Sequence, residues 1–183
     1  MKRAIAAVGS VMFLTFAVQC YAQNQQPQQP ATLRSLLLHE LQTTHNKAEW
    51  FVPISVAVDG LTAEQASWQP PGGGHSAGQS TYHLLFWNRR SLEKFQGTAQ
   101  EKYSGDNDET FVKFDTKQWN DTVRQLDQVM TDLEKLVETA DEQKLALWAP
   151  TIANICTHNA YHVGQIVYVR KLQGSWNPDK GVK

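Results

Sequence analysis

The chain has 183 residues, 41% of them hydrophobic, and a formal net charge of -1. These values are typical of a globular protein of about one domain. A chain without a positive balance is a poor match for nucleic acid, so we expect no nucleic-acid partner.

The first residues differ from the rest of the chain. Lys2 and Arg3 precede an uncharged, apolar run from Ala4 to Val18. This pattern predicts a secretory signal peptide over residues 1–22, with cleavage after Ala22. The run of about 15 residues is shorter than the roughly 20 that span a bilayer as a helix. We therefore expect an exported bacterial protein, periplasmic or extracellular, without a membrane anchor after cleavage.

Cys20 offers an alternative, because lipid attachment to this cysteine would anchor the chain. Gln19 disfavours that reading, since a small residue usually precedes such a cysteine. Cleavage after Ala22 leaves Cys156 without a second cysteine, so no intramolecular disulfide forms. It also leaves 15 basic against 18 acidic residues, a net charge of -3.

Residues 23–30 contain two prolines and no apolar residue, which predicts a flexible leader. A helical domain is expected over residues 31–174, followed by a loosely packed tail over 175–183. From Thr32, apolar residues recur at helical spacing and predict a first helix of about 26 residues that ends near Asp59. These residues are Leu33, Leu37, Leu41, Ala48 and Val52.

Two capping boxes follow. Thr62 with Gln65 predicts a short turn of helix within a connection over residues 60–75. Ser76 with Gln79 predicts the start of a second helix that reaches about Phe95.

The segment from Gly97 to Phe114 is polar and lacks a sustained period, so it is expected to be a long crossover loop. Asp115 is the expected cap of a third helix, whose apolar residues step by three or four. A fourth helix is predicted from Thr151 to Gln173, ending at Gly174. No segment shows the alternation of a strand, so we predict an all-α four-helix bundle with a long crossover between helices 2 and 3.

Three histidines carry the chemistry of this bundle. His158 and His162 are four residues apart, so both project from one helix face with a rise of roughly 6 Å between them. That face also carries Ile155 and Ile166, which aims both rings into the bundle. Taken alone, such a pair is more often two independent histidines than a metal site.

His83 favours a metal site over two independent histidines. It lies among apolar residues of the second helix, and a facing helix could deliver it as a third ligand. Three imidazoles without a fourth protein ligand leave a coordination position open, which is typical of catalytic metal sites. We therefore predict a divalent metal at His83, His158 and His162, with zinc and nickel both plausible. The sequence assigns no catalytic residue.

Other polar residues could surround this site. His45 lies on the inner face of the first helix and could be an extra ligand, a base or, as favoured, a core histidine bonded to a backbone carbonyl. Asn159, Tyr161 and Gln165 could orient the metal-binding rings, or could simply fill space between helices.

These residues together resemble the DinB-like superfamily, metal-binding four-helix bundles from bacteria, over about residues 31–174. Residues 61–71, Leu-Thr-Ala-Glu-Gln-Ala-Ser-Trp-Gln-Pro-Pro, are similar to that family's connection, and Ser76 stands where its second helix begins. Residues 158–166, His-Asn-Ala-Tyr-His-Val-Gly-Gln-Ile, are similar to its most recognisable signature. The resemblance implies metal binding by His83, His158 and His162.

The family includes enzymes that attach thiols to electrophiles, metal-dependent hydrolases and an isomerase branch that uses a thiol cofactor. The resemblance therefore implies the metal ligands but does not single out one reaction. Our functional hypothesis is an exported metal-dependent enzyme that activates water or a thiol against a small-molecule substrate. Export disfavours the thiol, because the family's thiols belong to the cytosol. The alternative is a non-catalytic metal- or ligand-binding bundle. The sequence is compatible with a homodimer.

Overall fold

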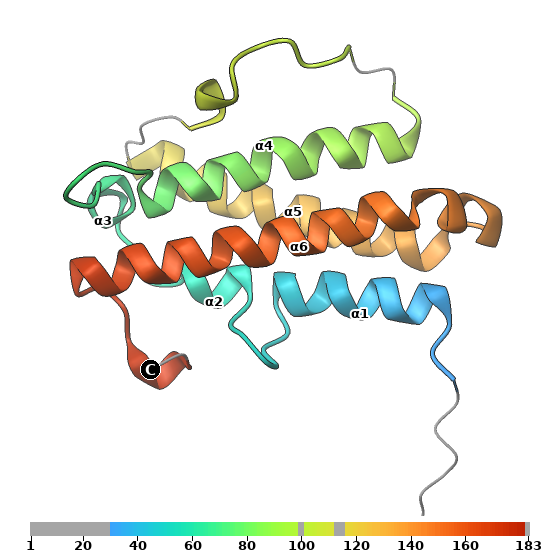
Figure 1. The fold of residues 1–183 in the computed structure, drawn as a ribbon, viewed down its shortest axis with the longest axis horizontal. Coiled ribbons are helices and arrows are strands. Elements are labelled where there is room, and N and C mark those ends of the chain that lie inside the picture. Colours follow the sequence, from blue (N-terminus) through green and yellow to red (C-terminus); the bar gives the residue numbers. More distant parts are fainter. Residues whose placement is uncertain (1–29, 99–100, 112–115, 182–183) are drawn as a thin grey trace, which may run out of the picture. The chain divides into compact units, whose positions relative to one another are not determined.

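The computed structural model describes residues 30–98, 101–111 and 116–181. Within these ranges the chain forms helices and no strand, which confirms the all-α class (Figure 1). The predicted signal peptide, residues 1–22, lies outside the described residues, as does the leader up to residue 29. None of the described helices is both long enough and apolar enough to cross a bilayer.

The described residues from Ala31 onward form one compact unit. Its elements in chain order are α1 (Leu33–His45), α2 (Ile54–Val58), α3 (Ala63–Ser67), α4 (Ala77–Gln96), the 3-10 turn η1 (Asn107–Thr110), α5 (Thr116–Thr139), α6 (Glu142–Gln173) and the 3-10 turn η2 (Pro178–Lys180).

The four longest helices pack in pairs around a shared core. Helix α4 contacts α5 and α6, and α1 contacts the other sides of α5 and α6 (Figure 1). Fully buried apolar side chains from all four helices fill the space between them, because each helix directs one apolar face inward. They include Leu41, Leu84, Leu126, Met130, Leu133, Leu145 and Ile166. In the described part of the crossover between α4 and α5, residues 97–98 and 101–111, the one helical element is the short turn η1.

Local capping follows the sequence closely. The Ser76 hydroxyl accepts from the backbone N–H of Gln79, and the Gln79 side chain accepts from the backbone N–H of Ser76. Thr62 and Gln65 form the same reciprocal pair at α3. These pairs satisfy backbone donors that a helix start leaves unpaired, and so fix where α4 begins.

The first predicted helix is interrupted. Helix α1 ends at His45, and a new short helix, α2, starts only after Pro53. Pro53 has no N–H to donate and disfavours helical geometry in the residue before it. The intervening residues 46–50 are exposed, and Trp50 is 98% accessible, before the chain is buried again at Val52. The prediction of one continuous helix to residue 59 is therefore wrong.

The last predicted helix is longer than expected. Helix α6 begins at Glu142, with Asp141 as its N-cap, and runs through Pro150. An internal proline removes one backbone hydrogen bond and costs on the order of 3 kcal/mol, which is why the predicted helix begins only after Pro150. Leu145, fully buried one turn after the cap, holds the extra turns against the core.

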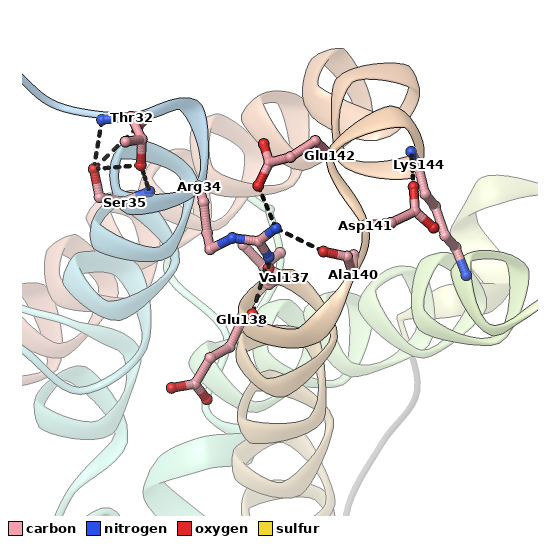
Figure 2. Close-up of polar contacts among 9 residues, drawn as sticks. All are labelled: Thr32, Arg34, Ser35, Val137, Glu138, Ala140, Asp141, Glu142 and Lys144. Carbon is pink, nitrogen blue, oxygen red and sulfur yellow. Dashed lines mark hydrogen bonds and ion pairs between the residues drawn. The ribbon is translucent and has the colours of Figure 1, made fainter.

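Arg34 joins α1 to the turn between α5 and α6 (Figure 2). Its guanidinium donates to the backbone oxygens of Val137, Glu138 (2.9 Å) and Ala140 (2.6 Å). It also forms an ion pair with Glu142 at 2.6 Å. A cation at the C-terminal end of α5 satisfies free carbonyl groups and complements the helix dipole.

A second arginine joins the end of α6 to α2. Arg170, only 3% exposed, donates to the backbone oxygen of Ala57 at 2.5 Å and to that of Ser175 at 3.0 Å. Trp176 packs against the same guanidinium and is itself buried. The start of the tail is therefore well packed, where the sequence suggested loose packing.

Candidate metal centre

Three histidine rings from two helices converge in the core. Helix α4 contributes His83, and α6 contributes His158 and His162. One ring nitrogen of each residue lies within 4.8 Å of the other two. His83 and His162 are buried, and His158 is half-buried. Among the described residues, this is the one group of three or more histidine, cysteine or acidic side chains with such spacing.

The hydrogen bonds around His83 fix its tautomer. Thr110 donates its hydroxyl proton to the backbone oxygen of Asn107, across 2.6 Å. The same hydroxyl oxygen lies 2.6 Å from Nδ1 of His83, so it must accept a proton from that nitrogen. Nε2 of His83 then carries a lone pair, and it faces Nε2 of His158 at 3.1 Å. Such a partner behind a ligating ring is typical of metal-binding histidines.

Burial keeps all three rings neutral at ordinary pH. Desolvation, with the rings of His162 and His158, lowers the pKa of His83 to about 3. Desolvation and His158 lower the pKa of His162 to about 4, although Gln165 acts in the opposite direction. Burial also lowers the pKa of His158. A neutral imidazole is the form that binds a metal ion.

The residues fit a divalent ion. Two nitrogens bound at about 2.1 Å in tetrahedral directions lie about 3.4 Å apart, close to the 3.1 Å between the Nε2 atoms of His83 and His158. Nδ1 of His162 is buried and has no hydrogen-bond partner among the described residues. A buried polar atom without a partner is costly, so this nitrogen is well suited to a ligand that the chain itself does not supply.

An aromatic stack covers one face of His83. The ring of Phe111 lies parallel to that of His83, with centroids 4.2 Å apart. The ring of His75 stacks on Phe111 at 3.6 Å. Nothing in the sequence marks Thr110, Phe111 or His75, because the first two lie in a segment without periodicity and the third in a glycine-rich connection.

A cavity of about 470 Å³ opens beside two of the three rings. It reaches His83 and His158, and Trp87 forms part of its wall. Its polar lining includes the amide side chains of Asn107 and Asn154. No carboxylate among the described residues lines this cavity. A reactant next to the three histidines would therefore meet amides and aromatic rings rather than an acidic base.

The three polar residues predicted around the pair lie in different surroundings. Asn159 is fully buried, where it accepts from the amide of Asn88 at 2.8 Å and so faces the core. Tyr161 is 62% exposed, with its ring edge-on to His162 at 5.1 Å. Gln165 donates to the Tyr161 hydroxyl at 3.0 Å.

His45 lies apart from the metal centre, at the end of α1. Its Nδ1 is 2.6 Å from a carboxylate oxygen of Glu134, and its Nε2 is 2.9 Å from one of Asp127. Both nitrogens therefore donate, as in the protonated ring. Burial alone would lower the pKa of His45, but the two carboxylates outweigh it and the net shift is upward. His45 is bonded to carboxylates, where the sequence favoured a backbone carbonyl.

Cys156 and Glu49 carry reactive side chains but take no part in this centre. Cys156 is buried in the core, and burial, with Glu40 adding to it, raises the pKa of its thiol to about 12. Glu49 forms surface ion pairs with Lys47 and His39.

Comparison with known proteins gave one match. Residues 54–166, more than half of the chain, match the family model described as DinB superfamily. The matched region contains all three histidines of the cluster. No curated protein and no solved structure matched the chain.

Proposed function

The chain belongs to the DinB superfamily, and from this premise we propose that it is a metal-dependent enzyme whose ion is held by His83, His158 and His162. The observation that carries the proposal is the convergence of three neutral imidazoles beside a cavity. Three protein ligands leave coordination positions free, as catalytic sites do.

Residues around the three histidines would orient a ligand, bind the reactant and exclude water. Thr110 orients His83 so that Nε2 faces the shared centre. Asn107 and Asn154 offer hydrogen bonds to a polar reactant, and Trp87 excludes water from one wall. A divalent ion bound here supplies Lewis acidity, which activates water or a thiol toward an electrophile.

We further propose that the substrate is a small molecule and that the protein is exported. Export is suggested by Lys2 and Arg3 followed by the apolar run up to Val18. In an oxidising compartment free thiols are scarce, which favours hydrolysis over thiol transfer. Zinc and nickel are both suited to three imidazole ligands.

Metal analysis of the purified chain tests the proposal. The wild-type chain should contain about one divalent ion per molecule, and His83→Ala should lose most of it. His39→Ala is the matched control, because His39 lies in α1 and pairs with Glu49 on the surface. Equal metal content in wild type and His83→Ala would refute the site.

Activity is tested on the same samples. Metal-loaded wild type is assayed against a panel of small esters and amides, and against an electrophile with an added thiol. Hydrolysis or thiol transfer that a chelator abolishes, and that the same metal restores, supports the enzyme. A chain that binds metal but turns over neither panel, and melts at a much lower temperature after chelation, supports a binding role instead.

A further inference from the structure

The cavity at the metal centre adjoins a second one with a basic lining. The second cavity measures about 480 Å³. It shares Trp87, Ser91 and Thr151 with the cavity that reaches His83 and His158. A molecule bound at the histidines could therefore extend past Trp87 into this neighbouring space.

Three cations line the second cavity, Arg90 and Lys94 from α4 and Lys102 from the crossover. One acid, Glu101, lines it as well. Among the described residues no carboxylate lies within ion-pair distance of any of these three cations. The chain as a whole has a net charge of -1, so a local excess of positive charge here is not an average property of the surface.

Aromatic rings and one backbone contact position two of these cations, Arg90 and Lys94. The Arg90 guanidinium lies over the rings of Phe86 and Tyr103, with distances of 5.8 and 5.6 Å to the centroids, and donates to the backbone oxygen of Glu101 at 2.5 Å. Lys94 lies 5.9 Å from the ring centroid of Trp148. Arg90 and Lys94 are thus positioned, yet they keep donors for a ligand.

We propose that the metal centre serves anionic substrates, whose reactive end lies at the three histidines and whose carboxylate or phosphate group lies between Arg90, Lys94 and Lys102. The body of such a molecule passes along the rings of Trp87, Tyr103 and Trp148, which suit an apolar or planar linker. This inference rests on the proposed function, because the reactive end needs the metal.

Paired thiols with one metal-binding group and different tails test the charge preference. Metal-loaded full-length chain is titrated with 6-mercaptohexanoate and with 6-mercaptohexan-1-ol, by calorimetry at low salt. The acid should bind about tenfold more tightly than the alcohol, and added salt should reduce the difference, because the cations are partly exposed. A third probe, 6-mercaptohexyl phosphate, shows whether phosphate or carboxylate is preferred, and either result supports the anionic class.

Variants locate the preference. Lys94→Gln combined with Lys102→Gln should remove most of the advantage of the acid while leaving the alcohol's affinity and the metal content unchanged. Arg90 is left in place because it also holds the backbone of Glu101. Lys117→Gln combined with Lys135→Gln removes the same charge from α5, away from the cavity, and should keep the preference.

The outcomes separate the two proposals. Absence of bound metal in the wild-type chain overturns the proposed function and this inference with it. A metal-loaded chain that binds acid and alcohol equally, or binds neither, overturns this inference alone. A preference that persists in the Lys94/Lys102 variant also overturns it, because the anion is then bound elsewhere.

Discussion

The Thr110 hydroxyl accepts a hydrogen bond from Nδ1 of His83 across 2.6 Å, and so connects the crossover to the three-histidine cluster. Thr110→Val keeps the shape of the side chain but removes the acceptor. We expect metal affinity to fall by about 10- to 100-fold, as is usual when the partner behind a ligating histidine is lost. Competition with a chromophoric chelator measures the affinity.

Thr110→Ser is the control for this prediction, because it restores a hydroxyl with one methyl group less. It should retain most of the affinity. Equal losses in the valine and serine variants would show that Thr110 contributes packing rather than orientation of His83.

The low pKa values at the cluster predict metal retention in mild acid. Protons compete with a metal only below the pKa of the ligand, which is about 3 for His83 and about 4 for His162. At an exposed histidine site, protons would already begin to compete with the metal near pH 6.5. We expect metal content after dialysis to remain high at pH 5. Release with a midpoint near 6.5 would contradict the burial of these rings.

The same shifts predict how the metal-free chain responds to acid. His83 and His162 have lower pKa values in the folded state than in the unfolded state, so the unfolded chain binds more protons below pH 6.5. Their contribution to the free energy of unfolding is therefore lost as pH falls from 6.5 toward 4. Denaturant titrations should show a smaller loss over this range for the variant His83→Gln, which has one such ring fewer.

His45 should have the opposite pH dependence. Its folded-state pKa is raised above 6.5 by Glu134 and Asp127, despite burial. Between pH 6.5 and the folded-state pKa, the folded chain then binds more protons than the unfolded chain. The stability that His45 contributes at pH 6 is therefore lost as pH rises through the folded-state pKa. His45→Gln should cost on the order of 2 kcal/mol at pH 6, and less at higher pH. A cost independent of pH would show that His45 is not protonated in the folded chain.

Arg34 should contribute to stability without affecting the metal centre. Arg34→Ala leaves the carbonyl groups at the end of α5 without their donor (Figure 2). We expect a loss on the order of 1–2 kcal/mol in the free energy of unfolding, and an unchanged number of bound metal ions. Arg34→Lys should recover only part of it, because an ammonium group lacks the planar array of donors. A loss of metal in Arg34→Ala would contradict the separation of the two regions.

The sequence predicted the features that depend on local chemistry. The capping pair Ser76 and Gln79 set the start of α4, and the spacing of His158 and His162 placed both rings on one face. Such features need only neighbours along the chain, so periodicity and capping rules are sufficient for them. The all-α class follows from the same periodicity.

Features that depend on distant contacts were missed or misplaced. Thr110 reaches His83 from 27 positions away, in a segment with no period, and nothing local marks it. The predicted fourth helix begins after Pro150, although the packing of Leu145 keeps α6 helical on both sides of this residue. The predicted first helix misses the break after His45, because the apolar spacing runs on to Val52. In each case tertiary packing or backbone chemistry outweighs the local pattern.

The contacts of Arg34 and Arg170 bear on how far the chain can be shortened and still fold. The family match spans residues 54–166 and omits all of α1, with Arg34, and the last turns of α6, with Arg170. A piece cut at those limits would expose the surfaces of α5 and α6 that α1 covers, and would leave carbonyl groups near Ala57 and Ala140 without their donors. Expression trials should therefore retain at least residues 31–181.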